Sequence, residues 1–489
     1  MPAAGAVGVE TLFGEEFDMS GPWNEQTDVV VIGSGAAGLS AAIEAREAGA
    51  SVIVLEKMKV TGGNTRISDG CLSAPDNFLQ KRRGVADSPE LFYDDLMKAG
   101  LGLNQPELVR VFAQQASDAI DWTRDLGVRY LDRLDRFGGH SAARGVTIQN
   151  NAGVDIIKRQ REKLGRLGMT IRTRSSLDAL ITGADGMTTG VRVGCGRDPS
   201  GSIRENMKTI LARRGVVIAT GGFGGDVGFR MRQNPRLDDA VSSTNHKGAT
   251  AEGLIAGLKI HAMPVHLSWI QLGPWGCADE TGYGRGARFA SYSVYPAGIV
   301  VDPGTGRRIV NEWGDRRQRS DAVFNTGRAC IGIVDSKGAE LDADSLGHCL
   351  KTQKIRRFKT ISSLGDAYGM PSGALEKTVA DYNRSIEDGN TDRFGKPLGR
   401  DANPVDAPPF YALRIWPKVH YTSGGLGINS RAQVMDLHGR PIPRLYAAGE
   451  VAGGVHGASR LGGCALPECI VFGRIAGRGA AALTPLDIG

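Results

Sequence analysis

A glycine turn between two apolar runs, at residues 28–57, limits the folds open to this chain more than any other feature. The stretch reads DVVVIGSGAAGLSAAIEAREAGASVIVLEK, an apolar run, a glycine turn, an Ala-rich segment and a second apolar run. Short apolar runs next to glycine turns indicate buried strands, whereas the longer Ala-rich segment indicates a helix. The stretch therefore predicts a β-α-β unit, which is typical of α/β folds.

The glycines of this unit have the spacing G-x-G-x-x-G. The motif consists of Gly33, Gly35, Ala36, Ala37 and Gly38. In such a turn the first glycine permits the sharp bend, the second lets the backbone approach a pyrophosphate and the third packs the helix against the strand. The helix N-terminus adds amide donors and a positive dipole. Glu56 closes the second run and is placed to hold a ribose. A dinucleotide is predicted, and the motif alone leaves both NAD and FAD open.

The overall composition indicates a large globular protein. The chain has 489 residues, of which 41% are hydrophobic and 23% charged, so at least two domains are expected. No apolar run reaches the roughly twenty residues that span a bilayer, and residues 1–26 contain neither Lys nor Arg nor an apolar core of a signal peptide. We expect a soluble, cytoplasmic protein without a membrane span.

Cysteine usage and charge exclude several functions. The seven cysteines show no C-x-x-C pair, which argues against a disulfide framework and a metal site. The net charge of +6 is spread along the chain without a Lys/Arg block, so nucleic-acid binding is not expected. The positive sign suits a small anionic substrate, with solubility alone as the alternative explanation.

The pattern changes twice along the chain, which predicts an inserted domain. Another strand followed by a glycine turn occurs in RRGVVIATGGFGGD. Residues from about 269 to 420 are more aromatic and contain basic clusters, and the last seventy residues return to strands, glycine turns and an Ala-rich helix. We therefore predict a nucleotide-binding domain in two parts, 26–267 and 420–489, with a capping domain at 268–419.

Eight motifs in a fixed order resemble those of the soluble fumarate reductase flavoprotein family, whose members also reduce urocanate and other enoates. They are GSGAAGLSAA, EKMKVTGGNT, VVIATGGFGGD, GATAEG, RRIVNEWGDRRQRS, HYTSGGLGI, RLYAAGEVAGGVHGASRLGG and FGRIAG. The resemblance covers nearly everything from residue 28 to 482. It implies an α/β architecture, a Rossmann-like FAD-binding domain with an inserted α+β capping domain, and FAD bound without a covalent link.

The same resemblance implies a set of FAD-binding residues. Glu56 is expected on the adenosine ribose, and Glu450, next to Gly449, near the ribityl chain. The pyrophosphate and flavin are expected to contact Lys57, Gly62, Gly63, Asn64, Thr65, Ser68 and Gly70. The adenosine side is expected to be closed by Thr220 and Gly221. Ala465 and Leu466 would offer backbone amides to the pyrimidine edge of the flavin, where negative charge develops on reduction.

Three residues in family motifs are expected to handle the substrate. Arg460, in ASRLGG, would clamp a carboxylate with its planar fork of donors, and His420, in HYTSGG, would help to orient it. Arg316, in NEWGDRR, would protonate the substrate carbon next to the one that receives hydride from flavin N5. Because a guanidinium rarely loses its proton, such an acid needs a relay that replaces the proton at once.

Two departures from the family pattern narrow the prediction. In WIQLGPWGC, Gly273 stands where fumarate reductases have a histidine for the second carboxylate of fumarate. In FASYSVYPAG, the acid and arginine of the usual relay are missing, and Tyr292 and Tyr295 are the nearest replacements, with a place in the core as the alternative. A larger, apolar pocket is expected to be lined by Trp269, Trp275 and Trp313, although core packing is an equal explanation.

The predicted function is an FAD-dependent oxidoreductase acting on a CH-CH bond, which reduces an α,β-unsaturated carboxylate other than fumarate. Two alternatives stay open: a dehydrogenase that introduces a double bond next to a carboxylate or ketone, as ketosteroid dehydrogenases do, and a flavoprotein without catalysis that carries electrons or binds a partner. No haem motif is present, so electrons are expected from a separate flavin reductase or a quinone.

Overall fold

The computed structural model describes residues 23–196, 207–389, 392–397 and 403–487. The expectation that no leader peptide is present concerns residues 1–26, of which residues 1–22 lie outside the described part of the chain. Among the described residues, no helix is long and apolar enough to cross a membrane.

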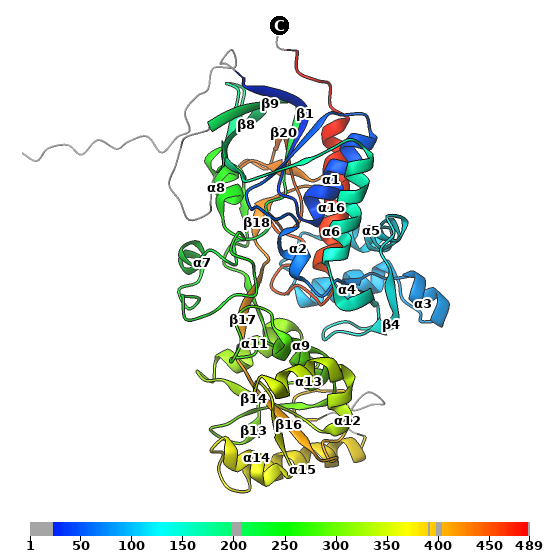
Figure 1. Ribbon diagram of the computed structural model, residues 1–489, viewed down its shortest axis with the longest axis vertical. Coiled ribbons are helices and arrows are strands. Elements are labelled where there is room, and N and C mark those ends of the chain that lie inside the picture. Colours follow the sequence, from blue (N-terminus) through cyan, green and yellow to red (C-terminus); the bar gives the residue numbers. More distant parts are fainter. Residues whose placement is uncertain (1–22, 197–206, 390–391, 398–402, 488–489) are drawn as a thin grey trace, which may run out of the picture.

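The upper part of the molecule is built around a mainly parallel sheet (Figure 1). The strand order is β19-β20-β9-β1-β2-β6, and the hairpin of β7 and β8 joins this sheet through β9. Its strands are β1 (Glu25–Ile32), β2 (Val52–Glu56), β6 (Ile171–Thr173), β7 (Ser175–Thr182), β8 (Thr188–Cys195), β9 (Met207–Ile218), β19 (Gln433–Met435) and β20 (Pro441–Ala447). Because β1 pairs in parallel with β2 on one side and β9 on the other, the predicted β-α-β unit is confirmed.

Helices α1 and α16 pack against one face of this sheet, and α8 lies against the hairpin strand β7. Figure 1 shows α1, α6 and α16 on one side of the sheet and α8 on the other. The apolar strand runs predicted this burial, since Val29, Val30 and Val31 are fully buried. The helices of this part are α1 (Ala36–Glu47), α2 (Gly63–Ile67), α3 (Phe78–Arg83), α4 (Pro89–Ala99), α5 (Pro106–Asp125), α6 (Val154–Arg166), α7 (Val227–Gln233), α8 (Glu252–Lys259) and α16 (Ala465–Ala481), with the short turn η1 (Gln149–Asn151).

The lower part of the molecule is an α+β capping domain, as expected (Figure 1). Its antiparallel sheet has the order β13-β12-β14-β16-β15. The strands are β12 (Ile299–Asp302), β13 (Arg307–Arg308), β14 (Cys330–Val334), β15 (Arg356–Phe358) and β16 (Phe410–Ile415). The helices are α9 (Arg285–Phe289), η2 (Ala290–Val294), α10 (Tyr295–Ala297), α11 (Arg316–Phe324), α12 (Ser336–Ala339), η3 (Glu340–Asp342), α13 (Ala343–Lys351), α14 (Ile361–Ala367) and α15 (Ala374–Glu387). Separate apolar clusters form the two sides of the cap sheet.

Short strands link the two parts and shape the space between them. The antiparallel pair of β11 (Ile270–Gly273) and β17 (Lys418–Thr422) lies where the chain enters and leaves the cap. Two smaller sheets have the strand orders β10-β18-β21 and β3-β5-β4. Their strands are β3 (Cys71–Ser73), β4 (Tyr130–Asp135), β5 (Gly145–Ile148), β10 (Pro264–Val265), β18 (Gly425–Gly427) and β21 (Ala452–Gly453). The domain limits at residues 268 and 419 stay predictions.

Candidate active site

Two adjoining cavities collect most of the predicted site residues. The first, here called the nucleotide groove, lies at the carboxyl ends of β1, β2 and β9. Of the predicted FAD-binding residues, it is lined by Gly33, Gly35, Ala36, Ala37, Glu56, Lys57, Gly63, Asn64, Thr65, Thr220, Gly221, Gly449 and Glu450. Ligands of open α/β sheets bind outside this edge. Asn64, Thr65 and Glu450 also line the second cavity, so the two spaces are continuous.

The glycine turn of the groove has the geometry that its sequence predicted. Gly33 has φ +107°, and a Cβ there would lie 2.2 Å from the carbonyl oxygen of Ala219. A Cβ at Gly38 would lie 2.0 Å from the carbonyl oxygen of Gly33, so this glycine serves helix packing and does not line the groove. A Cβ added at Gly35 would meet only Thr65 Oγ1, at 3.9 Å. The backbone of Gly35 is therefore open to a pyrophosphate at the N-terminus of α1.

Glu56 and Lys57 both line the groove, and both side chains have partners within the chain. The Glu56 carboxylate accepts hydrogen bonds from Ser34 Oγ (2.5 Å) and from the amide of Met58 (2.8 Å). Lys57 forms an ion pair with Glu252 (2.7 Å), so its positive charge is largely balanced. Ser34 was not predicted, because a serine inside a glycine motif carries no distinctive signal. Its hydroxyl also accepts from the amide of Gly62 (3.0 Å), which lines neither cavity.

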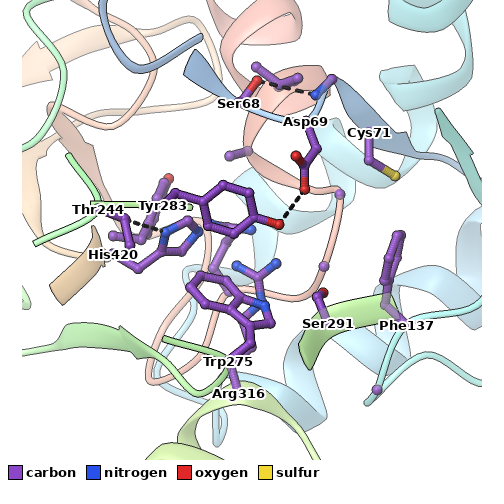
Figure 2. Close-up of a pocket in the computed structure, with 18 of the residues that line it drawn as sticks. Ser68, Asp69, Cys71, Phe137, Thr244, Trp275, Tyr283, Ser291, Arg316 and His420 are labelled. Atoms are coloured by element: carbon purple, nitrogen blue, oxygen red, sulfur yellow. Dashed lines mark hydrogen bonds between the residues drawn. The ribbon is translucent and has the colours of Figure 1, made fainter. Parts of the chain in front are cut away.

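The second cavity, here called the reaction cavity, lies between the nucleotide-binding part and the cap. All five residues predicted for catalysis line it, and so do four predicted FAD contacts that are absent from the nucleotide groove. These residues are Arg316, His420, Arg460, Tyr292 and Tyr295, with Ser68, Gly70, Ala465 and Leu466. Figure 2 shows Arg316 and His420 next to Trp275. Trp275 and Trp313 line the cavity as predicted. The same prediction for Trp269 is wrong, because this residue is not part of the lining.

Arg316 and Arg460 come from segments far apart in sequence and are tied together by side chains. Asp315 caps α11 by accepting from the amide of Arg317 (2.8 Å), which places Arg316 as the first helical residue. The same carboxylate accepts from Ser459 Oγ (3.3 Å), which directly precedes Arg460. Gln271 Nε2 donates to the carbonyl oxygen of Arg460 (3.0 Å). Strand β11 and Asp315 therefore hold the loop that carries Arg460 against the start of α11.

The positive charge in the reaction cavity is uncompensated. Among the described residues, neither Arg316 nor Arg460 forms an ion pair with a carboxylate, and each has a buried guanidinium nitrogen without a hydrogen-bond partner. Burial, together with the nearby charges of Arg460 and Arg319, holds the pKa of Arg316 well below its usual range. A buried charge normally needs a partner. The arrangement therefore calls for an anionic ligand.

Two buried carboxyl groups that feel the charge of Arg460 are poor partners for it. Burial raises the pKa of Glu450 to about 7, although hydrogen bonds from Thr422 and the charge of Arg460 oppose the shift. Burial also raises the pKa of Glu468 to about 8, and both of its carboxyl oxygens lack hydrogen-bond partners among the described residues. Both groups are thus substantially protonated near neutral pH. Arg460 instead lies over the ring of Tyr421, 4.5 Å from the centroid.

His420 lies in the reaction cavity as a neutral side chain. Its Nδ1 is 2.8 Å from Thr244 Oγ1, which leaves Nε2 for a ligand. Burial, followed by the charges of Arg316 and Arg460, holds the pKa of His420 well below its usual range. The imidazole stands edge-on to the indole of Trp275, with the ring centroids 4.6 Å apart. Thr244 was not predicted, since nothing in the local sequence links it to residue 420.

Trp275 explains the glycine at position 273. A Cβ at Gly273 would lie 1.9 Å from the Trp275 ring, so no larger side chain fits there while the indole keeps its place. The indole is 4% exposed and lines the reaction cavity. The indole thus forms an apolar wall at the end of β11, beside Gly273, the position at which fumarate reductases were expected to have a histidine.

The two tyrosines proposed as proton sources both pack against arginines. The Tyr295 hydroxyl donates to the carbonyl oxygen of Pro274 (2.9 Å), and Arg319 lies over its ring. The Tyr292 ring lies between the guanidinium groups of Arg133 and Arg288, at 5.5 and 4.9 Å. Burial raises the pKa of both tyrosines. Their role in proton transfer stays a prediction, and the geometry favours packing for Tyr295.

Comparison with known proteins agrees with this geometry. A family model described as "FAD binding domain" matches residues 28–466. The acrylate reductase flavoprotein subunit of Shewanella woodyi is 38% identical over 93% of this chain and 91% of its own length. The urocanate reductase of Eggerthella lenta is 32% identical over 93% and 75%. The open conformation of a flavocytochrome c3 fumarate reductase superposes with a TM-score of 0.74, at 33% identity, over 94% and 78%.

Proposed function

The chain belongs to the FAD binding domain family and is a flavoprotein oxidoreductase, and on this premise we propose that it reduces the double bond of an α,β-unsaturated monocarboxylate other than fumarate. The relatives named for acrylate and urocanate reduction support this choice, because each name denotes an unsaturated monocarboxylate. The same set of relatives supports reduction over the dehydrogenase alternative.

One observation carries the proposal: the reaction cavity holds two unpaired, buried arginines and a neutral histidine next to an indole wall. Arg460 and His420 suit one carboxylate, which would accept a bidentate hydrogen bond from the guanidinium. A second carboxylate at the end of β11 would lie against the Trp275 indole, because Gly273 has no side chain that could donate a hydrogen bond to it. The site therefore favours a substrate with one carboxylate.

The groove fits FAD, since the open backbone at Gly35, the carboxylate of Glu56 and the free amides at the start of α16 match its pyrophosphate, ribose and flavin ring. Bound FAD supplies the hydride for the double bond. We propose that Arg316 supplies the proton to the neighbouring carbon. Its depressed pKa makes proton loss less costly than for an ordinary arginine.

Anaerobic reoxidation of the reduced enzyme tests the proposed function. Acrylate, urocanate and cinnamate should reoxidise the reduced protein faster than fumarate, because only fumarate brings a second carboxylate to the wall formed by Trp275. The measurement is the stopped-flow return of flavin absorbance for each acid. Fumarate as the best substrate would contradict the proposal, and so would a panel in which saturated acids reduce the oxidised protein while no enoate reoxidises the reduced one.

We also propose that FAD is held without a covalent bond, and that electrons come from a separate flavin reductase or a quinone in the cytoplasm. The name of the relative from Shewanella woodyi, a flavoprotein subunit, supports a separate electron partner. Denaturing the purified protein should release all of its flavin as FAD into the supernatant, identified by chromatography. Flavin that stays with the precipitated chain, or FMN in the supernatant, would contradict this prediction.

A further inference from the structure

We propose that Asp69 and Tyr283 form the proton path that reloads Arg316 after each turnover, with Arg288 holding Asp69 in place. The inference rests on the proposed function, in which Arg316 gives its proton to the substrate. It supplies the relay whose usual acid and arginine are missing from residues 289–298. Neither Asp69 nor Tyr283 was expected from sequence.

The path is a short chain of polar groups on one wall of the reaction cavity. The Tyr283 hydroxyl donates to Asp69 Oδ2 (2.5 Å), and both residues line the cavity. Arg288 reaches the other carboxylate oxygen of Asp69 at 3.4 Å and braces itself on Asp342 at 3.3 Å. Figure 2 shows the bond between Tyr283 and Asp69 above the side chain of Arg316.

Trp275 brings this chain to Arg316. The Tyr283 ring packs edge-on against the indole, with centroids 5.4 Å apart, and the Arg316 guanidinium lies 5.4 Å from the centroid of the indole. Tyr283 is also among the groups that act on the pKa of Arg316. The tyrosine hydroxyl and the guanidinium therefore face the same part of the cavity.

Local structure holds Tyr283 in this position. It lies in the loop between β11 and α9, and the Glu280 carboxylate accepts from the amides of Gly286 (2.9 Å) and Ala287 (3.3 Å) at the start of α9. On the other side, Asp69 follows α2, whose end is fixed by Ser68 through a hydrogen bond to the carbonyl oxygen of Thr65 (2.8 Å). Both loops therefore have anchors besides the hydrogen bond between Tyr283 and Asp69.

The charges around Asp69 allow it to carry a proton. Burial raises the pKa of Asp69, and the charge of Asp342 adds to this shift, whereas the hydrogen bond from Tyr283 and the charges of Arg288 and Arg316 oppose it. Burial also raises the pKa of Tyr283, so this hydroxyl keeps its proton at rest. The charge of Asp69 also contributes to the raised pKa of two further neighbours, Cys71 and Tyr292.

The proton balance of the proposed step is complete. When Arg316 has given its proton to the substrate carbon, the Tyr283 hydroxyl turns from Asp69 to the neutral guanidine and gives it its proton. Tyr283 takes the proton of the Asp69 carboxyl group in the same movement, and the Asp69 carboxylate regains a proton from water in the open cavity, where its side chain is 23% exposed. Arg316 and Tyr283 end unchanged, and one proton passes from water to the product.

Asp69→Asn and Tyr283→Phe test the path, because each keeps the shape of the side chain and removes the transferable proton. With the enoate that turns over best, both variants should lose about tenfold or more in kcat with little change in KM. Their solvent deuterium isotope effect should rise, because proton delivery becomes slow. In the parent protein kcat should fall as pH rises and Asp69 ionises, and this decline should be absent from Asp69→Asn.

Asp279→Asn is the matched control, since it removes a carboxylate from the loop that carries Tyr283, where Asp279 pairs with Arg414 at 2.8 Å and lies outside the cavity lining. It should keep kcat within about twofold, and all variants should bind FAD like the parent. Arg316→Ala, measured alongside, distinguishes failure of the proton path from failure of the proposed function. If kcat is low in Arg316→Ala but normal in Asp69→Asn and Tyr283→Phe, the path is wrong and the proposed function stands. If Arg316→Ala is fast, the proposed function itself fails. Equal slowing by Asp279→Asn, or slowing without a change in isotope effect and pH profile, also overturns the path.

Discussion

Arg316→Ala should lower kcat by at least about a hundredfold with the best enoate, the usual scale of general acid catalysis. Arg316 begins α11 inside the reaction cavity, and it is buried beside other cations that depress its pKa. Its proton is needed only while the carbon is being reduced, so KM should change little. The measurement is stopped-flow mixing of reduced enzyme with substrate, which separates binding from chemistry.

Arg317→Ala provides the control for this variant. Arg317 is the next residue of the same helix, pairs with Asp321 at 3.5 Å and lies outside the cavity lining. It should react like the parent protein, and both variants should contain a full complement of FAD. Near-normal kcat in Arg316→Ala would show that the proton comes from elsewhere, with Tyr292 next to test.

Arg460→Ala should act mainly on binding. Arg460 is 5% exposed and has no carboxylate partner among the described residues, so the substrate carboxylate is its expected partner in both the ground state and the transition state. Removing it should cost about 2–4 kcal/mol, which raises KM by roughly thirtyfold to several hundredfold. Steady-state kinetics over a wide range of substrate concentrations give this value.

Arg460→Lys tests whether the planar fork matters as well as the charge. A lysine restores the positive charge but offers a single ammonium group in place of two parallel donors, so it should recover only part of the lost affinity. An effect of Arg460→Ala confined to kcat would show that Arg460 belongs to the chemical step. An unchanged KM and kcat would remove it from the substrate site.

The sequence by itself determined the nucleotide-binding part of the fold. A strand, a glycine turn and a helix are local patterns, and the geometry at Gly33, Gly35 and Gly38 follows from contacts within a few residues and one neighbouring strand. The motifs around Arg316, His420 and Arg460 also pointed to one site, and these three residues do line one cavity. The missing histidine at Gly273 was visible without a structure, because a single position in a known motif had changed.

Only the tertiary structure decided what fills the cavity and where protons can travel. Trp275 occupies the space beside Gly273. The Tyr283 hydroxyl donates to Asp69, which is 214 positions away in sequence, and the Tyr295 hydroxyl donates to a backbone carbonyl oxygen. Each of these contacts joins segments whose local patterns are independent of each other. Their distances depend on how the cap packs against the nucleotide-binding part, and side-chain contacts between separate segments leave no periodic signal in one sequence.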